Sequence, residues 1–303
     1  MSETITVGGP YFEDFAVGQQ QEAPPSITIN EGHAAIHEAM FADRLRLPLD
    51  KHLSQKVTGS ETALVNPSLF CNIAIGQTTF ASQRVKANLF YRGLLQKRPL
   101  FAGDTLYTAT KVVALKQNKV KPGRAATGLV ALEMTVTNQR DEEVMTFWRC
   151  PMIPCRDKEA NTGHADSFDA MPDVIDMDAV AAALPKWDLD AWREHLGGQH
   201  FGDVERGAKY IIDSRDTVTS APELVRMTLN MAVAHTDAGR SVYNKRLVYG
   251  GHTISMAAAQ IVRAFPNMLN IVAWHGCDHT GPVFENDILR SEVTVTGKRD
   301  LGA

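Results

Sequence analysis

The sequence lacks any apolar run near the roughly 18 residues that a membrane-spanning helix needs. No lysine or arginine precedes Arg44, so its start lacks the basic region of a secretory signal. Four cysteines are too few for a disulfide scaffold, and Cys150 and Cys155 do not form a C-x-x-C pair, which gives a zinc or redox site little support. These absences favour a soluble, reduced, cytoplasmic protein.

The sequence also lacks a strong excess of either charge. Its 31 basic and 35 acidic side chains give a net charge of −4, so we expect no general attraction to nucleic acid or to a membrane surface. Apolar residues make up 44% and charged residues 22%, as in ordinary globular proteins. A length of 303 residues then suggests two domains of about 150 residues each.

An internal repeat makes the two-domain prediction specific. Residues 11–18 (YFEDFAVG) match residues 200–207 (HFGDVERG), and residues 98–113 match residues 281–296. In the second match three residues coincide, namely Pro99, Phe101 and Asp104 with Pro282, Phe284 and Asp287. Such self-similarity is typical of two copies of one structural unit.

Each copy has the same order of expected elements. A first helix is predicted at residues 31–45 and 221–234, and a longer, apolar helix at 68–81 and 251–264. Alternating residues predict strands at 105–115, 127–138 and 144–153, the last two joined by the turn signal NQRDEE. The pattern indicates an α+β unit, in which a curved antiparallel sheet surrounds one long helix.

The repeat sets the expected domain boundaries at 1–155, 156–199 and 200–303. Residues 156–199 contain ten acidic and four basic side chains, and we expect a solvated acidic linker with a short helix near 177–184. The second copy continues for seven residues after Thr296, whereas the first continues for 42 residues after the equivalent Val113. The sequence therefore predicts that the second unit lacks its last hairpin.

The segments YFEDFAVGQ, LVYGGHTIS, RPLFAGDTL and GPVFENDIL resemble the MaoC-type hydratases and dehydratases of the hotdog fold. The double-length layout is most similar to the mesaconyl-CoA hydratase branch of that family. The resemblance implies a double hotdog, with two curved antiparallel sheets each wrapped around a long central helix. It also implies a hydro-lyase that adds water reversibly to a short, methyl-branched or dicarboxylic enoyl-CoA, with acyl-CoA as substrate and with no cofactor or metal.

The family's working motif is Asp-x4-His, and residues 230–235 have this spacing with Asn230 in the first position. The matching part of the first copy has no such pair, so we expect the second copy to be catalytic and the first to supply wall and scaffold. His235 suits a general base because imidazole exchanges protons near neutral pH. Asn230 can hold the attacking water by hydrogen bonds, but its amide does not titrate.

Gly250, Gly251 and His252 open the long helix of the second copy. Unpaired N–H groups at a helix start, with no side chain in the way, suit an oxyanion hole. The resemblance puts Gly251 at the oxyanion position, and we assign Gly250 and His252 to substrate binding.

Three arginines are candidates for binding CoA phosphates or a substrate carboxylate, because arginine pairs with both in a bidentate manner: Arg92, Arg240 and Arg246. A further group, His275, Cys277 and His279, would share one face of a strand. For that group we favour a structural or pocket-lining role over metal binding.

Two other functions remain open at this point. A hotdog thioesterase would direct water to the thioester carbonyl, generally with a carboxylate as base or nucleophile, and would release free thiol. A non-catalytic acyl-CoA-binding protein would bind CoA without turnover. Because hotdog units commonly pair, the resemblance also allows a homodimer or larger homo-oligomer.

Overall fold

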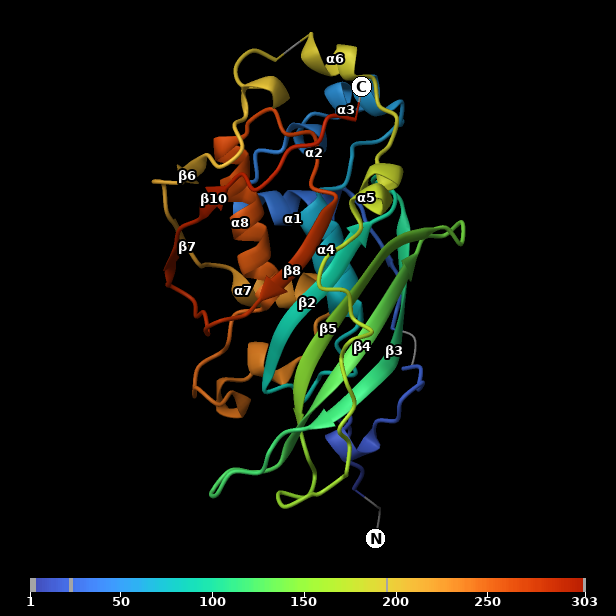
Figure 1. The fold of residues 1–303 in the computed structure, drawn as a ribbon, viewed down its shortest axis with the longest axis vertical. Helices are drawn as coiled ribbons and strands as arrows, with labels where there is room; N and C mark the ends of the chain where they lie inside the picture. Colours follow the sequence, from blue (N-terminus) through green and yellow to red (C-terminus); the bar gives the residue numbers. More distant parts are fainter. Residues whose placement is uncertain (1–3, 22–23, 195, 302–303) are drawn as a thin grey trace.

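A six-stranded antiparallel sheet wrapped around a buried helix forms the larger part of the molecule (Figure 1). The computed structural model describes residues 4–21, 24–194 and 196–301. The strand order is β1-β3-β4-β5-β2-β8. The strands of the first unit are β1 (Ile27–Thr28), β2 (Ala87–Gln96), β3 (Thr105–Gln117), β4 (Thr127–Thr137) and β5 (Glu143–Pro154).

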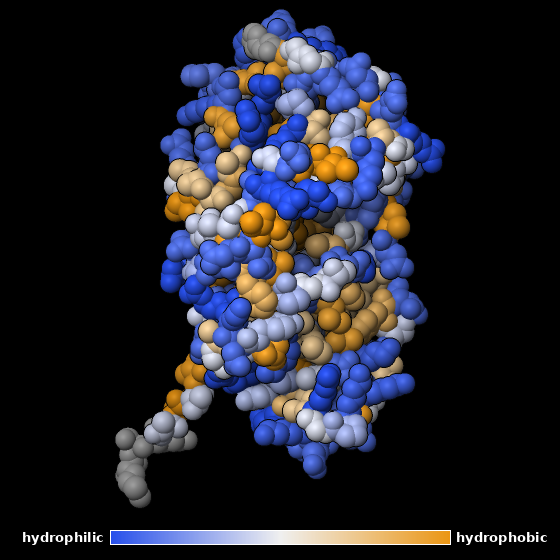
Figure 2. Space-filling view, turned by 90° about the vertical axis from the view of Figure 1, so that its left-hand side faces the viewer, coloured by the Kyte–Doolittle hydropathy of each residue, from blue (hydrophilic) through white to orange (hydrophobic). Residues whose placement is uncertain are grey.

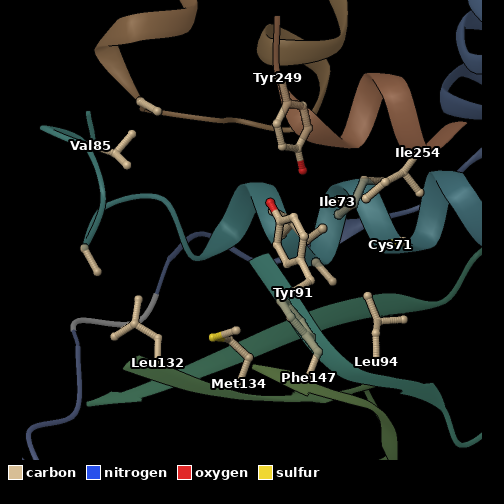
Figure 3. Packing of buried hydrophobic residues seen from close by; sticks show 14 of the residues in the cluster. Cys71, Ile73, Val85, Tyr91, Leu94, Leu132, Met134, Phe147, Tyr249 and Ile254 are labelled. Atoms are coloured by element: carbon tan, nitrogen blue, oxygen red, sulfur yellow. The ribbon is translucent and has the colours of Figure 1, made fainter. Parts of the chain in front are cut away.

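Helix α4 (Pro67–Gln77) lies in the concave face of this sheet, and every one of its residues is buried. Its sequence PSLFCNIAIGQ is apolar on all sides, as a helix enclosed by protein must be. In Figure 3, Cys71 and Ile73 of α4 lie above Leu132, Met134 and Phe147 of the sheet. This contact forms the main hydrophobic core.

The remaining elements surround this core. The first unit adds η1 (Phe12–Asp14), α1 (Glu31–Phe41), α2 (Arg46–Leu49) and α3 (Lys51–Thr58), and the linker adds α5 (Met177–Ala183) and α6 (Leu189–Arg193). The helices of the second unit are η2 (Phe201–Asp203), α7 (Ala221–Met227), η3 (Val233–His235), η4 (Ala238–Arg240) and α8 (Gly250–Ala264). Its strands are β6 (Lys209–Ile211), β7 (Asp216–Thr217), β8 (Ala273–Asp278), β9 (Ile288–Leu289) and β10 (Glu292–Thr294).

The repeated residues make the same contacts in both units. The Asp14 side chain accepts from the Tyr11 N–H, and Asp203 accepts from His200 in the same way, both at 2.9 Å. Likewise Gln77 donates to the Leu106 carbonyl at 3.1 Å and Gln260 to the Leu289 carbonyl at 3.3 Å. The sequence repeat is therefore a repeat of local structure.

The two units are joined through their central helices and by one strand. Asn72 of α4 donates to the Ser255 hydroxyl of α8 at 2.7 Å, and β8 extends the large sheet by pairing with β2. The other strands of the second unit form two small sheets, β6 with β10 and β7 with β9. Within residues 196–301 there is no counterpart of β4 and β5.

The predicted α+β class is confirmed, but the expected helix ends need correction. Helix α7 stops at Met227 rather than near 234, because Leu229 adopts a left-handed backbone with φ of 55°. Helix α4 stops at Gln77 rather than 81, where the hydroxyls of Thr78 and Thr79 bond back to the carbonyls of Ile75 and Gly76.

The linker is less solvated than its charge predicts. Met171, Ile175, Val180 and Trp192 are buried in clusters with residues of the two units. The Asp166 carboxylate also accepts from the Leu115 N–H of β3 at 2.8 Å. The expectation of a solvated linker rested on its acidic residues, but the apolar residues between them pack against the two units.

The surface on the side of α8 and β10 carries apolar patches between hydrophilic residues (Figure 2). The small sheets expose the side chains of Ile211 and Ile288, at 56% and 63% of their surface. No helix in the described part of the chain is both long and apolar enough to cross a membrane.

Candidate active site

A cavity of about 240 Å³ lies between the two units and contains most of the groups able to perform chemistry. The second unit contributes Asn230, His235, Gly250 and His279 to its wall. The first unit contributes polar or charged side chains that belong to none of the sequence motifs: Thr79, Lys86, Asn88, Tyr91 and Arg149. The site is thus built from both copies.

The segment that carries Asn230 is held against the first unit. The Met231 N–H donates to the Thr79 hydroxyl at 2.8 Å, and the Val233 N–H donates to the Gln83 carbonyl at 3.0 Å. The Asn230 side-chain oxygen accepts from the Ala232 N–H at 2.9 Å. That bond fixes the orientation of the amide and leaves its NH₂ as a donor that Asn230 can offer to a ligand.

His235 has a defined proton position. Its Nδ1 lies 2.7 Å from the Leu247 carbonyl oxygen, which can only accept, so Nδ1 carries the proton and Nε2 keeps a free lone pair. Burial lowers the pKa of His235 to about 4; the hydrogen bond to Leu247 opposes this shift, and the charges of His279 and Arg149 add to it. The ring is therefore neutral at pH 7 and able to accept a proton.

Helix α8 begins at this cavity without a side-chain cap. The Gly250 backbone lies directly against the imidazole of His279, since a Cβ at this position would be 2.5 Å from Cε1 and 2.7 Å from Nε2. Gly251 faces the other way, where a Cβ would overlap the Asn72 side chain of α4. Gly250 thus lines the cavity, while Gly251 permits the close approach of the two central helices.

His279 lies on the cavity wall, just beyond the end of β8. Its Nε2 is buried and has no hydrogen-bond partner among the described residues, and burial lowers the pKa of the ring. The ring meets Tyr91 edge-on at 5.5 Å between centroids. Of the three residues in the His275 group, it is the one that the structure places beside the candidate chemistry.

Two tyrosines and an arginine complete the interior. Figure 3 shows Tyr91 and Tyr249 with their hydroxyl oxygens directed toward each other, and burial raises the pKa of both. Arg149 of β5 is 3% exposed. The strand pattern carried a signal for it, because Met145, Phe147 and Arg149 alternate and an arginine stands where an apolar side chain is expected.

Four predicted binding residues lie elsewhere. His252 is buried against Phe41, with ring centroids 4.8 Å apart, and burial lowers its pKa to about 4. Arg92 pairs with Asp278 at 2.6 Å, Arg246 pairs with Glu285 at 2.5 Å, and Arg240 is exposed. None of the four lines the cavity that contains His235. The three arginines of this group carry charge near the surface, and sequence alone does not distinguish such a charge from one in a binding site.

Other regions offer less chemistry. His275 accepts from the Ile175 N–H at 3.0 Å, and Cys277 packs against the core. No group of histidine, cysteine and acidic residues in the described ranges could hold a metal ion. A larger cavity of about 700 Å³, where the linker meets the second unit near Trp192, contains none of the predicted site residues.

Comparison with known proteins agrees with this architecture. Residues 38–147 match the family described as FAS1-like, dehydratase domain region. The β-methylmalyl-CoA dehydratase of Chloroflexus aurantiacus is 30% identical over 97% of this chain and 86% of its own length. The mesaconyl-CoA hydratase of Cereibacter sphaeroides is 28% identical over 97% and 85%.

Two solved structures share the whole fold. A conserved protein of Mycobacterium tuberculosis described as having a double hotdog fold is 44% identical, with a TM-score of 0.90 over 98% of this chain and 89% of its own. A Chloroflexus aurantiacus protein described as a MaoC domain dehydratase is 27% identical, with a TM-score of 0.83 over 97% and 84%. The chain therefore belongs to the MaoC-like family of hydratases and dehydratases, in its double hotdog form.

Proposed function

We propose that this protein catalyses the reversible hydration of a short enoyl-CoA thioester similar to mesaconyl-CoA. The observation that carries the proposal is the meeting, in one cavity, of a neutral histidine with a free Nε2 and an uncapped helix start at Gly250. The names of the relatives supply the class of substrate.

His235 acts as the proton carrier. As water adds to the β-carbon, Nε2 takes one of its protons, and the resulting imidazolium returns that proton to the α-carbon. A pKa near 4 makes the imidazolium a strong acid toward the enolate and the neutral ring a correspondingly weak base toward the water. The net change is the addition of H and OH across the double bond, and it requires no redox cofactor.

The start of α8 polarises the thioester. The N–H groups of Gly250 and Gly251 have no acceptor within the helix, whereas the His252 N–H donates to the Tyr249 carbonyl at 2.9 Å, and the helix dipole places partial positive charge at this end. An enolate oxygen near Gly250 accepts these bonds more strongly than the ground-state carbonyl does, which lowers the barrier. Gly251 remains a candidate for the second donor through its backbone N–H, although its Cα faces α4.

Asn230 and His279 replace the second titrating group that an Asp-x4-His site would have. The Asn230 NH₂ can donate to the water oxygen while the water donates to His235. His279, packed on Gly250, can bond through its unpartnered Nε2 to the bound thioester or the water. The wall groups of this cavity include no aspartate or glutamate in the described residues, which disfavours a thioesterase that uses a carboxylate.

The direct test is the loss of enoyl-thioester absorbance when purified protein meets mesaconyl-CoA or crotonyl-CoA. A thiol reagent in a parallel reaction separates hydration, which keeps the thioester, from hydrolysis, which releases CoA. Hydration without thiol release is the expected result. Thiol release without hydration would establish a thioesterase, and CoA binding with neither reaction would establish a binding protein.

A further inference from the structure

Arg149 is a buried cation without an ion-pair partner in the described part of the chain. Its side chain is on β5, its exposure is 3%, and it lines the cavity that holds His235. Removing a guanidinium from water is costly unless an anion or a full set of hydrogen bonds compensates for the loss. The site therefore has a charge that the protein does not neutralise.

The bonds of Arg149 explain only part of its position. Its Nη2 donates to the Thr78 carbonyl and to the Ser82 hydroxyl, both at 2.8 Å. Thr78 ends helix α4, so this contact stabilises the negative end of the helix dipole. The Nε atom, however, is buried and has no hydrogen-bond partner among the described residues. A guanidinium has N–H donors on all three nitrogens, so the protein supplies fewer acceptors than Arg149 has donors.

The cavity as a whole is complementary to an anion. Its charged wall residues in the described ranges are Lys86 and Arg149, both basic. The titratable groups that act on the pKa of Arg149 are Tyr91, Tyr249 and Cys150, which are neutral at pH 7. The arginines first considered as anchors, Arg92 and Arg246, are already paired with acidic side chains.

We infer that Arg149 binds a carboxylate on the acyl chain, so that the substrate is the CoA thioester of a short dicarboxylic acid. This inference rests on the proposed hydratase function and assigns a specificity-determining residue to it. Arg149 and His235 line the same cavity of about 240 Å³, so a substrate held beside His235 has its acyl chain within that cavity. In a four-carbon dicarboxylic enoyl group the free carboxylate is attached directly to the double bond. The phosphates of CoA, in contrast, are separated from the double bond by the whole pantetheine arm.

The first experiment compares two substrates on the unmodified protein. Mesaconyl-CoA and 2-methylcrotonyl-CoA differ in that a methyl group of the second stands in the place of the carboxylate. We expect kcat/KM to be at least about 10²-fold higher for mesaconyl-CoA, because a site built for a polar group rejects the analogue that lacks it. Equal values would overturn the inference while leaving the hydratase function intact, and turnover of neither would overturn the hydratase function itself.

The second experiment assigns the preference to Arg149. In R149Q the ratio of the two kcat/KM values should fall toward one, because the carboxylate loses its charge-assisted bonds. S82A is the matched control, since it removes one hydrogen-bond partner of Arg149 and keeps the charge, and its ratio should stay near that of the parent. A ratio that R149Q leaves unchanged would show that Arg149 only supports the end of α4.

A binding measurement on the parent protein covers the case in which R149Q does not fold. Succinyl-CoA and butyryl-CoA have the same chain length and differ in a terminal carboxylate. Calorimetry should give a Kd at least about tenfold lower for succinyl-CoA, the smaller effect expected of one charge-assisted bond. Equal affinities would contradict a carboxylate site in this cavity.

Discussion

The two central helices start in opposite ways, although they occupy equivalent places in the repeat. In the first unit the Asn66 side chain accepts from the N–H groups of Ser68 and Leu69, and Pro67 has no N–H to satisfy. In the second unit Tyr249 provides no side-chain cap, and the helix opens with Gly250 at the cavity. One helix start is capped by a side chain, and the other is uncapped and lies at the cavity.

The difference shows how two copies of one structural unit can take different roles. Helix α4 uses its first turn for stability, with Asn66 also donating to the buried carboxylate of Asp43 at 2.8 Å. At the start of helix α8 the His252 N–H donates to the Tyr249 carbonyl at 2.9 Å, but no side chain caps the N–H groups of Gly250 and Gly251, which in the proposed function bind developing negative charge. The first unit nevertheless enters the site through β2 and β5, by way of Tyr91 and Arg149.

The largest expected effect comes from His235, which has no equivalent in the first unit. H235A should lower kcat by about 10²–10⁴-fold, the range for losing a general acid–base group. Steady-state hydration of mesaconyl-CoA measures it. H200A is the matched control, because the His200 Nε2 also contacts a backbone carbonyl, that of Leu196 at 3.1 Å, but lies outside this cavity. Equal losses in both variants would remove His235 from the mechanism.

A somewhat smaller effect is expected at Gly250. In G250A the new methyl group would meet the His279 ring and narrow the approach to the helix start. We expect kcat to fall by about 10²–10³-fold, as when an oxyanion donor is lost. G297A serves as control because its Cβ would meet nothing within 4 Å. If G250A were fully active, the start of α8 would not be where the thioester binds.

The dependence of activity and stability on pH should distinguish His235 in the cavity from His252 in the core. Since His235 must be neutral and its pKa is about 4, kcat/KM should stay level from pH 8 to 5 and fall only near pH 4. His252 has a similarly lowered pKa, so both groups bind more protons unfolded than folded between about 6.5 and 4. Stability should therefore fall as the pH drops through that window. An activity limb centred at 6.5 would contradict a desolvated His235.

Sequence predicts the fold well where the repeat leaves a local mark. The Asp residues of the repeated segments are needed for the same turn bonds in both units, as Phe101 to Asp104 at 2.9 Å and Phe284 to Asp287 at 2.8 Å show. Such short-range bonds can be read from residue type and spacing. The left-handed Leu229 could not be predicted, because leucine has no local preference for that backbone; it lies two residues before Met231, whose N–H donates to the Thr79 hydroxyl of the first unit, a contact distant in sequence.

The residues of the candidate site also fall into those that local sequence motifs predict and those that only the fold brings together. His235, Asn230 and Gly250 belong to local motifs, and all three line the cavity. Arg149 and Tyr91 are more than 50 positions apart in the sequence, and the pairing of β2 with β5 brings them together. From sequence, Gly251 is placed at the oxyanion position and Gly250 in substrate binding, but sequence alone cannot show that Gly250 lines the cavity while Gly251 packs against Asn72, because that depends on how α8 is turned against α4.

Removing the side-chain cap at the start of α4 should lower the stability of the protein and leave its activity nearly unchanged. N66A removes the cap of α4 and one donor to Asp43, so we expect the free energy of unfolding to fall by about 1–2 kcal/mol. Urea denaturation measures the change, and kcat/KM of the folded fraction should remain within about twofold of the parent value. Comparable losses of activity in N66A and G250A would mean that the two helix starts are not functionally different.

The smallest expected effect is at Arg92, which stands beside Tyr91 on β2 but on the opposite face of the strand. Its partner Asp278 is 62% exposed, and the guanidinium rests on the Phe90 ring 4.4 Å away. An exposed pair of this kind contributes about 0–1 kcal/mol, so R92Q should change stability by no more than that and kcat/KM by less than about twofold. Because Arg149 shares the inner face with Tyr91, R149Q and R92Q differ chiefly in which side of the sheet loses its charge. If R92Q impaired turnover of mesaconyl-CoA as strongly as R149Q, position on the sheet would not explain the choice of substrate, and overall positive charge would be the simpler cause.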